Sequence, residues 1–146
     1  MRTRHPWMAM MIASVLAAAG SAPGAEGFQI VVHPSVEGSK ISRSVLAEIY
    51  QKDVIRWGND VRIRPVDQSS QTPVRRAFTQ EILGRSLGEV QEYWTQRLAV
   101  DREMPPPTKA SDEEVLAFVA AKKGAIGYVT AGIDLPPDVK VIDLIE

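Results

Sequence analysis

The segment with the clearest chemical potential is the polar stretch 67–76, which reads Asp-Gln-Ser-Ser-Gln-Thr-Pro-Val-Arg-Arg. It places Ser70 and Thr72 before a proline, a residue favoured at the first position of a helix. The first amide hydrogens of a helix have no partner within the helix and carry about half a positive charge. Arg75 and Arg76 in the first turn could add charge-assisted contacts. The four side chains therefore predict an oxyanion site.

The same residues have a second interpretation that needs no ligand. Ser70 or Thr72 would then cap the helix, and both arginines would be solvated. A serine-rich loop at 34–42 is a second candidate for a binding loop, with a flexible turn as its alternative. Ligands gather at the carboxyl ends of strands in α/β sheets, so we expect this loop and the loop 69–72 at the same end of the sheet.

Catalytic and metal-binding residue types are sparse. After the first 25 residues the chain has one histidine, His33, and it has no cysteine and no Gly-x-Ser-x-Gly motif. His33 has no second imidazole or thiolate to share a metal, so a structural role is expected. The acidic residues 112–114 are explained by helix capping and the helix dipole. We expect no enzyme activity, no catalytic residues, no bound metal and no cofactor.

The N-terminal segment has the pattern of a secretory signal. A basic start precedes an apolar run from Trp7 to Ala19, and small residues follow as far as Ala25. A membrane-crossing helix needs about 20 apolar residues, which is more than this run supplies. We expect residues 1–25 to be a cleaved signal peptide and the protein to act in the periplasm. The expected mature chain has 15 basic and 18 acidic side chains, which favours no nucleic-acid partner.

Residues 26–146 have the length of one ordinary domain, and strands alternate with helices along them. Apolar runs predict strands at 28–33, 61–66, 125–129 and 139–142. Helical spacing and capping residues predict helices at 42–51, 73–84, 86–98 and 111–123, and the proline-containing segment 101–110 is expected to be a stiff connection. This order predicts a three-layer αβα sandwich with a mixed or mostly parallel sheet.

Two further features concern packing rather than chemistry. Trp57, Tyr93, Trp94 and Tyr128 could form a stacking platform, but they occur in phase with leucine and valine residues. That phasing favours a place in the core. Gly127 lies inside a predicted strand, which indicates close approach of another backbone or of a ligand.

Several short motifs occur in the order found in one group of proteins. They are Leu46–Tyr50 leading to Trp57–Asp60, Ile63–Val66, Ser70–Thr72 running on to Arg76–Phe78, Tyr93–Trp94 and Lys123–Val129. In this order the chain resembles the substrate-binding components of ABC-type phosphate importers, of the type II periplasmic-binding-protein-like group. The string Gly-Ala-Ile-Gly-Tyr-Val at 124–129 is the most specific part of the resemblance.

The resemblance implies a periplasmic domain, residues 26–146, that looks like one lobe of a periplasmic binding protein and binds phosphate or a similar oxyanion. Ser70 and Thr72 match the family's anion loop, whereas Arg75 and Arg76 are added by the helix-end argument. Gln71 replaces the family's central glycine, and the arginine ahead of the loop is absent. Asp67 stands near the site instead, where an ionised carboxylate would repel a dianion.

Importers of this kind close two lobes on the anion, and this chain has the length of one. The resemblance therefore implies a role in ABC-type phosphate uptake in which a second copy, a transporter permease or another periplasmic protein completes the cleft. The alternative is a periplasmic adaptor or sensor that keeps the lobe fold without a ligand. Neither interpretation requires a cofactor.

Overall fold

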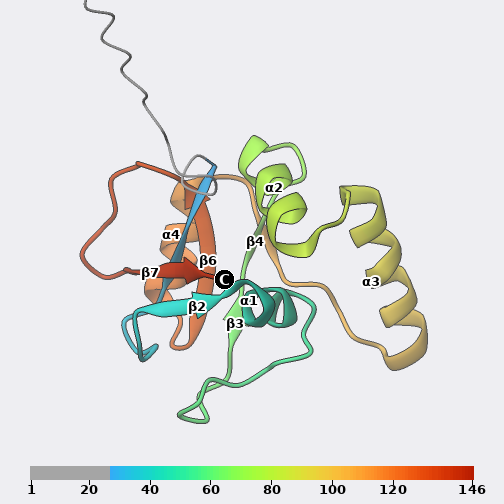
Figure 1. Cartoon of the computed structure of the whole chain (residues 1–146), viewed down its shortest axis with the longest axis horizontal. Helices are drawn as coiled ribbons and strands as arrows, with labels where there is room; N and C mark the ends of the chain where they lie inside the picture. The colour runs from blue at the N-terminus through green and yellow to red at the C-terminus, as the bar shows by residue number, and fades with distance from the viewer. Residues whose placement is uncertain (1–26) are drawn as a thin grey trace, which may run out of the picture.

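The computed structural model describes residues 27–146, and the predicted signal peptide 1–25 lies outside these described residues. Figure 1 shows the order of the elements along the chain. The strands are β1 (Phe28–Val32), β2 (Lys40–Ser42), β3 (Arg64–Pro65), β4 (Asp67–Gln68), β5 (Thr108–Lys109), β6 (Ala125–Thr130) and β7 (Lys140–Ile145). The helices are α1 (Arg43–Tyr50), α2 (Pro73–Phe78), its π-helical continuation η1 (Thr79–Leu83), α3 (Leu87–Asp101) and α4 (Asp112–Ala121).

The main sheet is mixed, with the strand order β2-β7-β1-β6-β3. Its central strand β1 pairs antiparallel with both β6 and β7, in a register that sets Phe28 opposite Thr130. The outer strands run parallel to their neighbours, β2 beside β7 and β3 beside β6. The predicted mixed sheet is confirmed. Residues 125–129 of β6 are all buried, as expected of an inner strand with helices on both faces.

Helices cover both faces of the sheet, which confirms the predicted three layers. Phe28, Ile30 and Val32 of β1 pack into one core cluster with residues of α1 and α2, whereas Val31 packs on the opposite face with residues of α4. This division follows from the two-residue period of a strand, which sends alternate side chains to opposite faces. Figure 1 shows α4 on one side of the sheet and α1 and α2 on the other.

Gly127 marks a close approach, as predicted, but the neighbours are apolar side chains. A Cβ atom at this position would lie 2.8 Å from Val115 Cγ1 of α4 and 2.9 Å from Val66 Cγ1. The glycine therefore lets α4 pack closely against β6. The sequence pattern detected the approach without identifying which element makes it.

The segment after the first helix differs from the prediction in its details. The predicted strand 61–66 is reduced to β3, preceded by a single bridge between Arg56 and Arg62. The predicted loop 67–72 begins with a second short strand, β4, which pairs in parallel with β5 in the connection 101–110. Strands of two residues are too short to show the alternation on which strand prediction depends.

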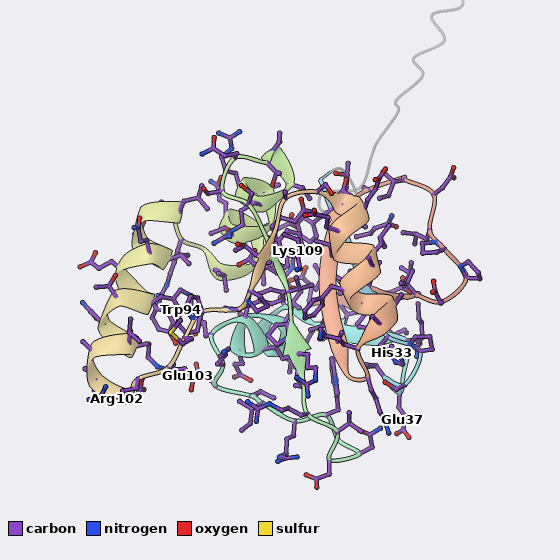
Figure 2. All side chains as sticks on the ribbon, turned by 180° about the vertical axis from the view of Figure 1, so that it is seen from behind. His33, Glu37, Trp94, Arg102, Glu103 and Lys109 are labelled. Carbon is purple, nitrogen blue, oxygen red and sulfur yellow. The ribbon has the colours of Figure 1, made fainter. Side chains whose placement is uncertain are left out.

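Helix α3 extends away from the sheet, as Figure 1 shows. Trp94 lies on the side of α3 that faces the rest of the molecule (Figure 2) and is 9% exposed. Leu98, predicted to be buried in the same stripe, is 47% exposed. The hydroxyl of Tyr93 donates to the Gln51 carbonyl at 3.0 Å and fastens the helix to the end of α1. Within residues 27–146, no helix has both the length and the apolar character needed to cross a membrane.

Candidate anion-binding site

The loop 69–72 joins β4 to α2, and hydrogen bonds fix both of its ends. The Ser69 amide donates to the Lys109 carbonyl of β5 at 2.9 Å. Thr72 is the N-cap of α2, because its Oγ1 accepts from the Arg75 amide at 3.3 Å. The same hydroxyl donates to the Ser69 carbonyl at 2.8 Å. Thr72 therefore has the capping role that the ligand-free interpretation of the sequence gave it.

Ser70 and Arg75 come together at one end of a groove with a volume of about 870 Å³. The groove's other walls are formed by α3, including Trp94, and by the proline segment of the connection 101–110. Ser70 is exposed to solvent. Arg76 is also exposed but lies beside a different hollow, next to Gln80 at the far side of α2. Of the four predicted residues, two share the groove, Thr72 caps the helix and Arg76 stands apart.

Arg75 is engaged by groups of its own chain. Its Nη1 lies 3.3 Å from Asp67 Oδ1, and both side chains are only 12% exposed. The same nitrogen donates to the Gln68 carbonyl at 2.7 Å, and Nε donates to Thr79 Oγ1 at 3.1 Å. The guanidinium thus joins β4 to α2, and its charge is compensated inside the domain.

Asp67 is the partner that sequence reasoning treated only as a source of repulsion. Its carboxylate accepts from the Tyr128 hydroxyl through a short hydrogen bond and from the Gln68 amide at 3.0 Å. Burial raises the pKa of Asp67, while the Arg75 charge and the Tyr128 hydrogen bond oppose that rise. Burial and the neighbouring Asp67 raise the pKa of Tyr128. No spacing rule pairs residues 67 and 75, so the sequence carried no direct signal for this contact.

Gln68 connects this network to the other face of the sheet. Its side-chain amide donates to Asp112 Oδ1 of α4 at 2.6 Å and to the Tyr128 carbonyl at 3.2 Å. Asp112 Oδ1 also accepts from the Thr130 amide at 3.0 Å. Burial of Asp112 would raise its pKa, but the hydrogen bonds from Thr130 and Gln68 outweigh that effect and lower the pKa. Asp112 therefore does more than help to start a helix.

The loop 34–42 does not join the loop 69–72. Because β1 runs antiparallel to β6 while β3 runs parallel to it, the two loops follow strands that end at opposite ends of the sheet. The expectation that they share one end is wrong. His33 Nδ1 lies 2.8 Å from Ser35 Oγ, which accepts from the Gly124 amide at 3.0 Å. This histidine orders a turn, as the structural interpretation proposed.

The described aromatic residues near the groove belong mainly to the core. Tyr128 is fully buried, and its ring stacks on Phe78 with the centroids 3.8 Å apart. Within residues 27–146, no three His, Asp or Glu side chains come close enough together to hold a metal ion. Every buried side-chain nitrogen or oxygen of this part of the chain has a hydrogen-bond partner. The scaffold of the groove is therefore satisfied without any added group.

Neither protein-family models nor curated proteins match the chain. Solved structures do match its fold. An ABC-type phosphate transport receptor from Vibrio cholerae aligns over 82% of this chain with a TM-score of 0.62 and 20% identity. A Clostridium perfringens protein, named as a phosphate ABC transporter substrate-binding protein and crystallised with bound phosphate, aligns over 82% with a TM-score of 0.61 and 20% identity. The chain has the fold of a phosphate-receptor lobe.

The likeness covers only part of those receptors. This chain matches 46% of the Vibrio cholerae protein and 45% of the Clostridium perfringens protein, so it spans less than half of their length. PstS from Borrelia burgdorferi gives the same result, with a TM-score of 0.60, 13% identity and 47% of its chain covered. The predicted resemblance to phosphate importers in a short, lobe-like form is confirmed at the level of the fold.

Proposed function

We propose that the chain is a periplasmic solute-binding domain that binds phosphate or a similar oxyanion at the loop 69–72. The observation that carries the proposal is the match of 82% of the chain to solved structures named as phosphate transport receptors, one of them with bound phosphate. Their names describe binding and transport rather than catalysis, which supports a binding role here as well. The signal-like segment 1–25 supports export.

The proposed contacts combine a hydroxyl with the start of a helix. The exposed Ser70 hydroxyl donates to an anion oxygen at the end of the groove. Thr72 keeps the start of α2 in place through its cap, and Arg75 holds the loop against β4 while its charge offsets that of Asp67. Arg76, exposed on the same short helix, adds positive potential during the approach of the anion. Binding needs no cofactor.

A second lobe would complete the cleft. The chain supplies less than half of the length of the receptors that it resembles, and one wall of its groove is open to solvent. We propose that a second copy of the chain, an ABC transporter permease or another periplasmic protein covers this side. The role would then be delivery of phosphate for uptake.

The test is a thermal-shift titration of the purified full chain with phosphate, sulfate and molybdate. A ligand that binds the folded state alone raises the melting temperature in proportion to its concentration relative to Kd. Phosphate is expected to raise it, and Ser70→Ala is expected to reduce the shift. Sodium chloride at matched ionic strength is the control, because general screening acts on all exposed charges. A chloride shift as large as the phosphate shift would refute specific binding.

The second candidate is a ligand-free adaptor or sensor with the lobe fold. The Asp67–Arg75 ion pair favours it, because the buried guanidinium is compensated within the chain and has no need of an external anion. This candidate predicts that none of the three oxyanions raises the melting temperature beyond chloride. It also predicts a stable complex with a periplasmic protein in the absence of any small molecule.

A further inference from the structure

Four cationic side chains gather at the opposite end of the β3–β4 run from the loop 69–72. They are Arg62, Arg64, Lys122 and Lys123, here called the basic cluster, and they line one shared hollow. A deeper pocket adjoins it and is lined in part by the same residues. We propose that this pocket is a second binding site, for a small organic anion that carries an apolar group. The inference is independent of the proposed oxyanion site.

The backbone holds the two halves of the basic cluster together at Gly124. This residue has φ of +80°, and a Cβ atom here would lie 2.2 Å from the Arg62 carbonyl oxygen. The Gly124 carbonyl accepts from the Arg64 amide at 3.1 Å and from Trp57 Nε1 at 2.9 Å. The strand that carries the arginines is thus fixed against the end of α4 that carries the lysines. The gathering of charge is built into the fold.

The basic cluster is not neutralised by the chain itself. In the part of the chain that the structure describes, no carboxylate oxygen lies within 4.0 Å of its four cationic groups. Acidic residues outnumber basic ones in the domain, so the cluster is not a result of overall composition. The dipole of α4 favours the two lysines at its carboxyl end. It does not account for Arg62 and Arg64, which come from another element.

The adjoining pocket offers an apolar surface beside these charges. Its volume is about 340 Å³, and its walls include Ile63, Pro65 and Phe118. Ile55 also lines it and is 48% exposed, which is unfavourable for a large aliphatic side chain in water. Lys122 Nζ lies 5.3 Å from the centre of the Phe118 ring, so a cation stands directly over the apolar wall. Volumes of this size suit small organic molecules.

The chemistry of the ligand follows from these two surfaces. An anionic group, such as a carboxylate or phosphate, would contact Arg62, Arg64 and Lys122. An aryl or short alkyl group would cover Phe118 and Ile55. At the far side of the pocket Lys52 is already paired with Glu103 at 3.2 Å, so this side adds no net charge. The positive charge therefore lies at one side only, which fits a ligand with one charged end.

The pocket is separate from the proposed oxyanion site. The parallel pairing of Arg64 with Ala125 places it where β3 and β6 begin, whereas the loop 69–72 follows β4 at the other end of the run. Amide chemical shifts can therefore report on the two sites individually. Perturbation of residues 62–64 and 122–124 marks the basic cluster, and perturbation of residues 69–72 marks the oxyanion site.

The experiment is an NMR titration of the full chain with phenyl phosphate, inorganic phosphate and neutral benzyl alcohol. Phenyl phosphate is expected to shift the amides of 62–64 and 122–124 saturably, with Kd at or below about 1 mM. Inorganic phosphate and benzyl alcohol are each expected to bind there at least about tenfold more weakly, because each lacks one of the two contacts. The double variant Arg62→Gln/Lys122→Gln is expected to lose at least about tenfold in affinity for phenyl phosphate.

The matched control is Lys40→Gln/Arg102→Gln, which removes two exposed cations away from the pocket. It is expected to bind phenyl phosphate as the unaltered chain does. Three results would overturn the inference: no shift at 62–64 and 122–124, equal weakening by the control pair, or equal binding of inorganic and phenyl phosphate at the cluster. Shifts confined to 69–72 would support the oxyanion site and refute this one.

Discussion

The two ends of the strand run from Arg64 to Gln68 treat charge in opposite ways. Near Gln68, the guanidinium of Arg75 is paired with the carboxylate of Asp67, and both side chains are almost buried. Near Arg64, the basic cluster is exposed and, within residues 27–146, has no carboxylate within 4.0 Å. A charge matched inside the chain stabilises the fold, whereas unmatched charges remain available to a ligand. The four predictions that follow test this difference.

The largest expected effect comes from removing one partner of the matched pair. Arg75→Ala leaves the carboxylate of Asp67 buried without its cation, which is expected to lower the free energy of unfolding by about 3 kcal/mol. Urea unfolding measures the change. Arg76→Ala is the matched control, because this neighbouring arginine is exposed and should leave the unfolding free energy nearly unchanged. Equal losses in the two variants would show that the Asp67–Arg75 pair does not stabilise the fold.

Gly124 tests how firmly the basic cluster is held. Gly132→Ala, at φ of +81° with open space around the new Cβ, is expected to cost about 1 kcal/mol from backbone strain alone. Gly124→Ala has the same strain and a clash with the Arg62 carbonyl, so we expect about 2 kcal/mol more. Thermal or urea unfolding compares the two. Similar losses would mean that the close contact at Gly124 yields at little cost.

A smaller effect separates capping from ligand binding in the loop 69–72. Thr72→Ala removes the N-cap of α2 and is expected to lower the unfolding free energy by about 1 kcal/mol. Ser70→Ala removes an exposed hydroxyl and is expected to change stability little while weakening phosphate binding. Unfolding and phosphate titration of both variants provide the two measurements. A stability loss at Ser70 equal to that at Thr72 would contradict this division of roles.

The smallest expected effect is a pair of opposite pH dependences. Burial raises the pKa of Asp67 above 3.8, so its contribution to stability is present at low pH and is lost as pH rises through the raised value. Asp112 has a lowered pKa, so its contribution is present above 3.8 and is lost as pH falls through the lowered value.

Urea unfolding of the unaltered chain, Asp67→Asn and Asp112→Asn between about pH 3 and about pH 7 tests both signs. The stability difference between the unaltered chain and Asp67→Asn should fall with rising pH. The corresponding difference for Asp112→Asn should grow. Slopes of the same sign would show that at least one of the two carboxyl groups has been given the wrong environment.

The sequence was sufficient for the layers of the fold. Alternation of helices and strands, together with caps such as Thr72 and the left-handed Gly84 after the second helix, predicted the three-layer architecture that the structure has. Local periodicity decides which face of an element is buried, and these faces were predicted for β1, α1 and α4. The signal peptide prediction stays a prediction, because it concerns residues outside the described part.

The sequence was insufficient for contacts between distant segments. It did not reveal the Asp67–Arg75 pair, the bridge from Gln68 to Asp112, or the pairing of β4 with β5. Each depends on strand direction and on the placement of helices, which local patterns do not specify. For the same reason, the loop 34–42 was wrongly expected to lie beside the loop 69–72.

The basic cluster shows the same limit. Arg62 and Arg64 stand almost sixty positions from Lys122 and Lys123 in the chain. The outward arginines were predicted from strand alternation, and the lysines from the helix end. Only the parallel pairing of β3 with β6 brings the two pairs together.

Isothermal titration calorimetry of phosphate into the purified full chain tests the central claim most directly. We predict a saturable heat with one phosphate per chain and Kd below about 1 mM, and a loss of about tenfold in affinity for Ser70→Ala. Arg62→Gln/Lys122→Gln, altered only at the other end of the strand run, should bind inorganic phosphate at the loop 69–72 as the unaltered chain does. The absence of heat at millimolar phosphate, or unchanged affinity in Ser70→Ala, would contradict the proposal.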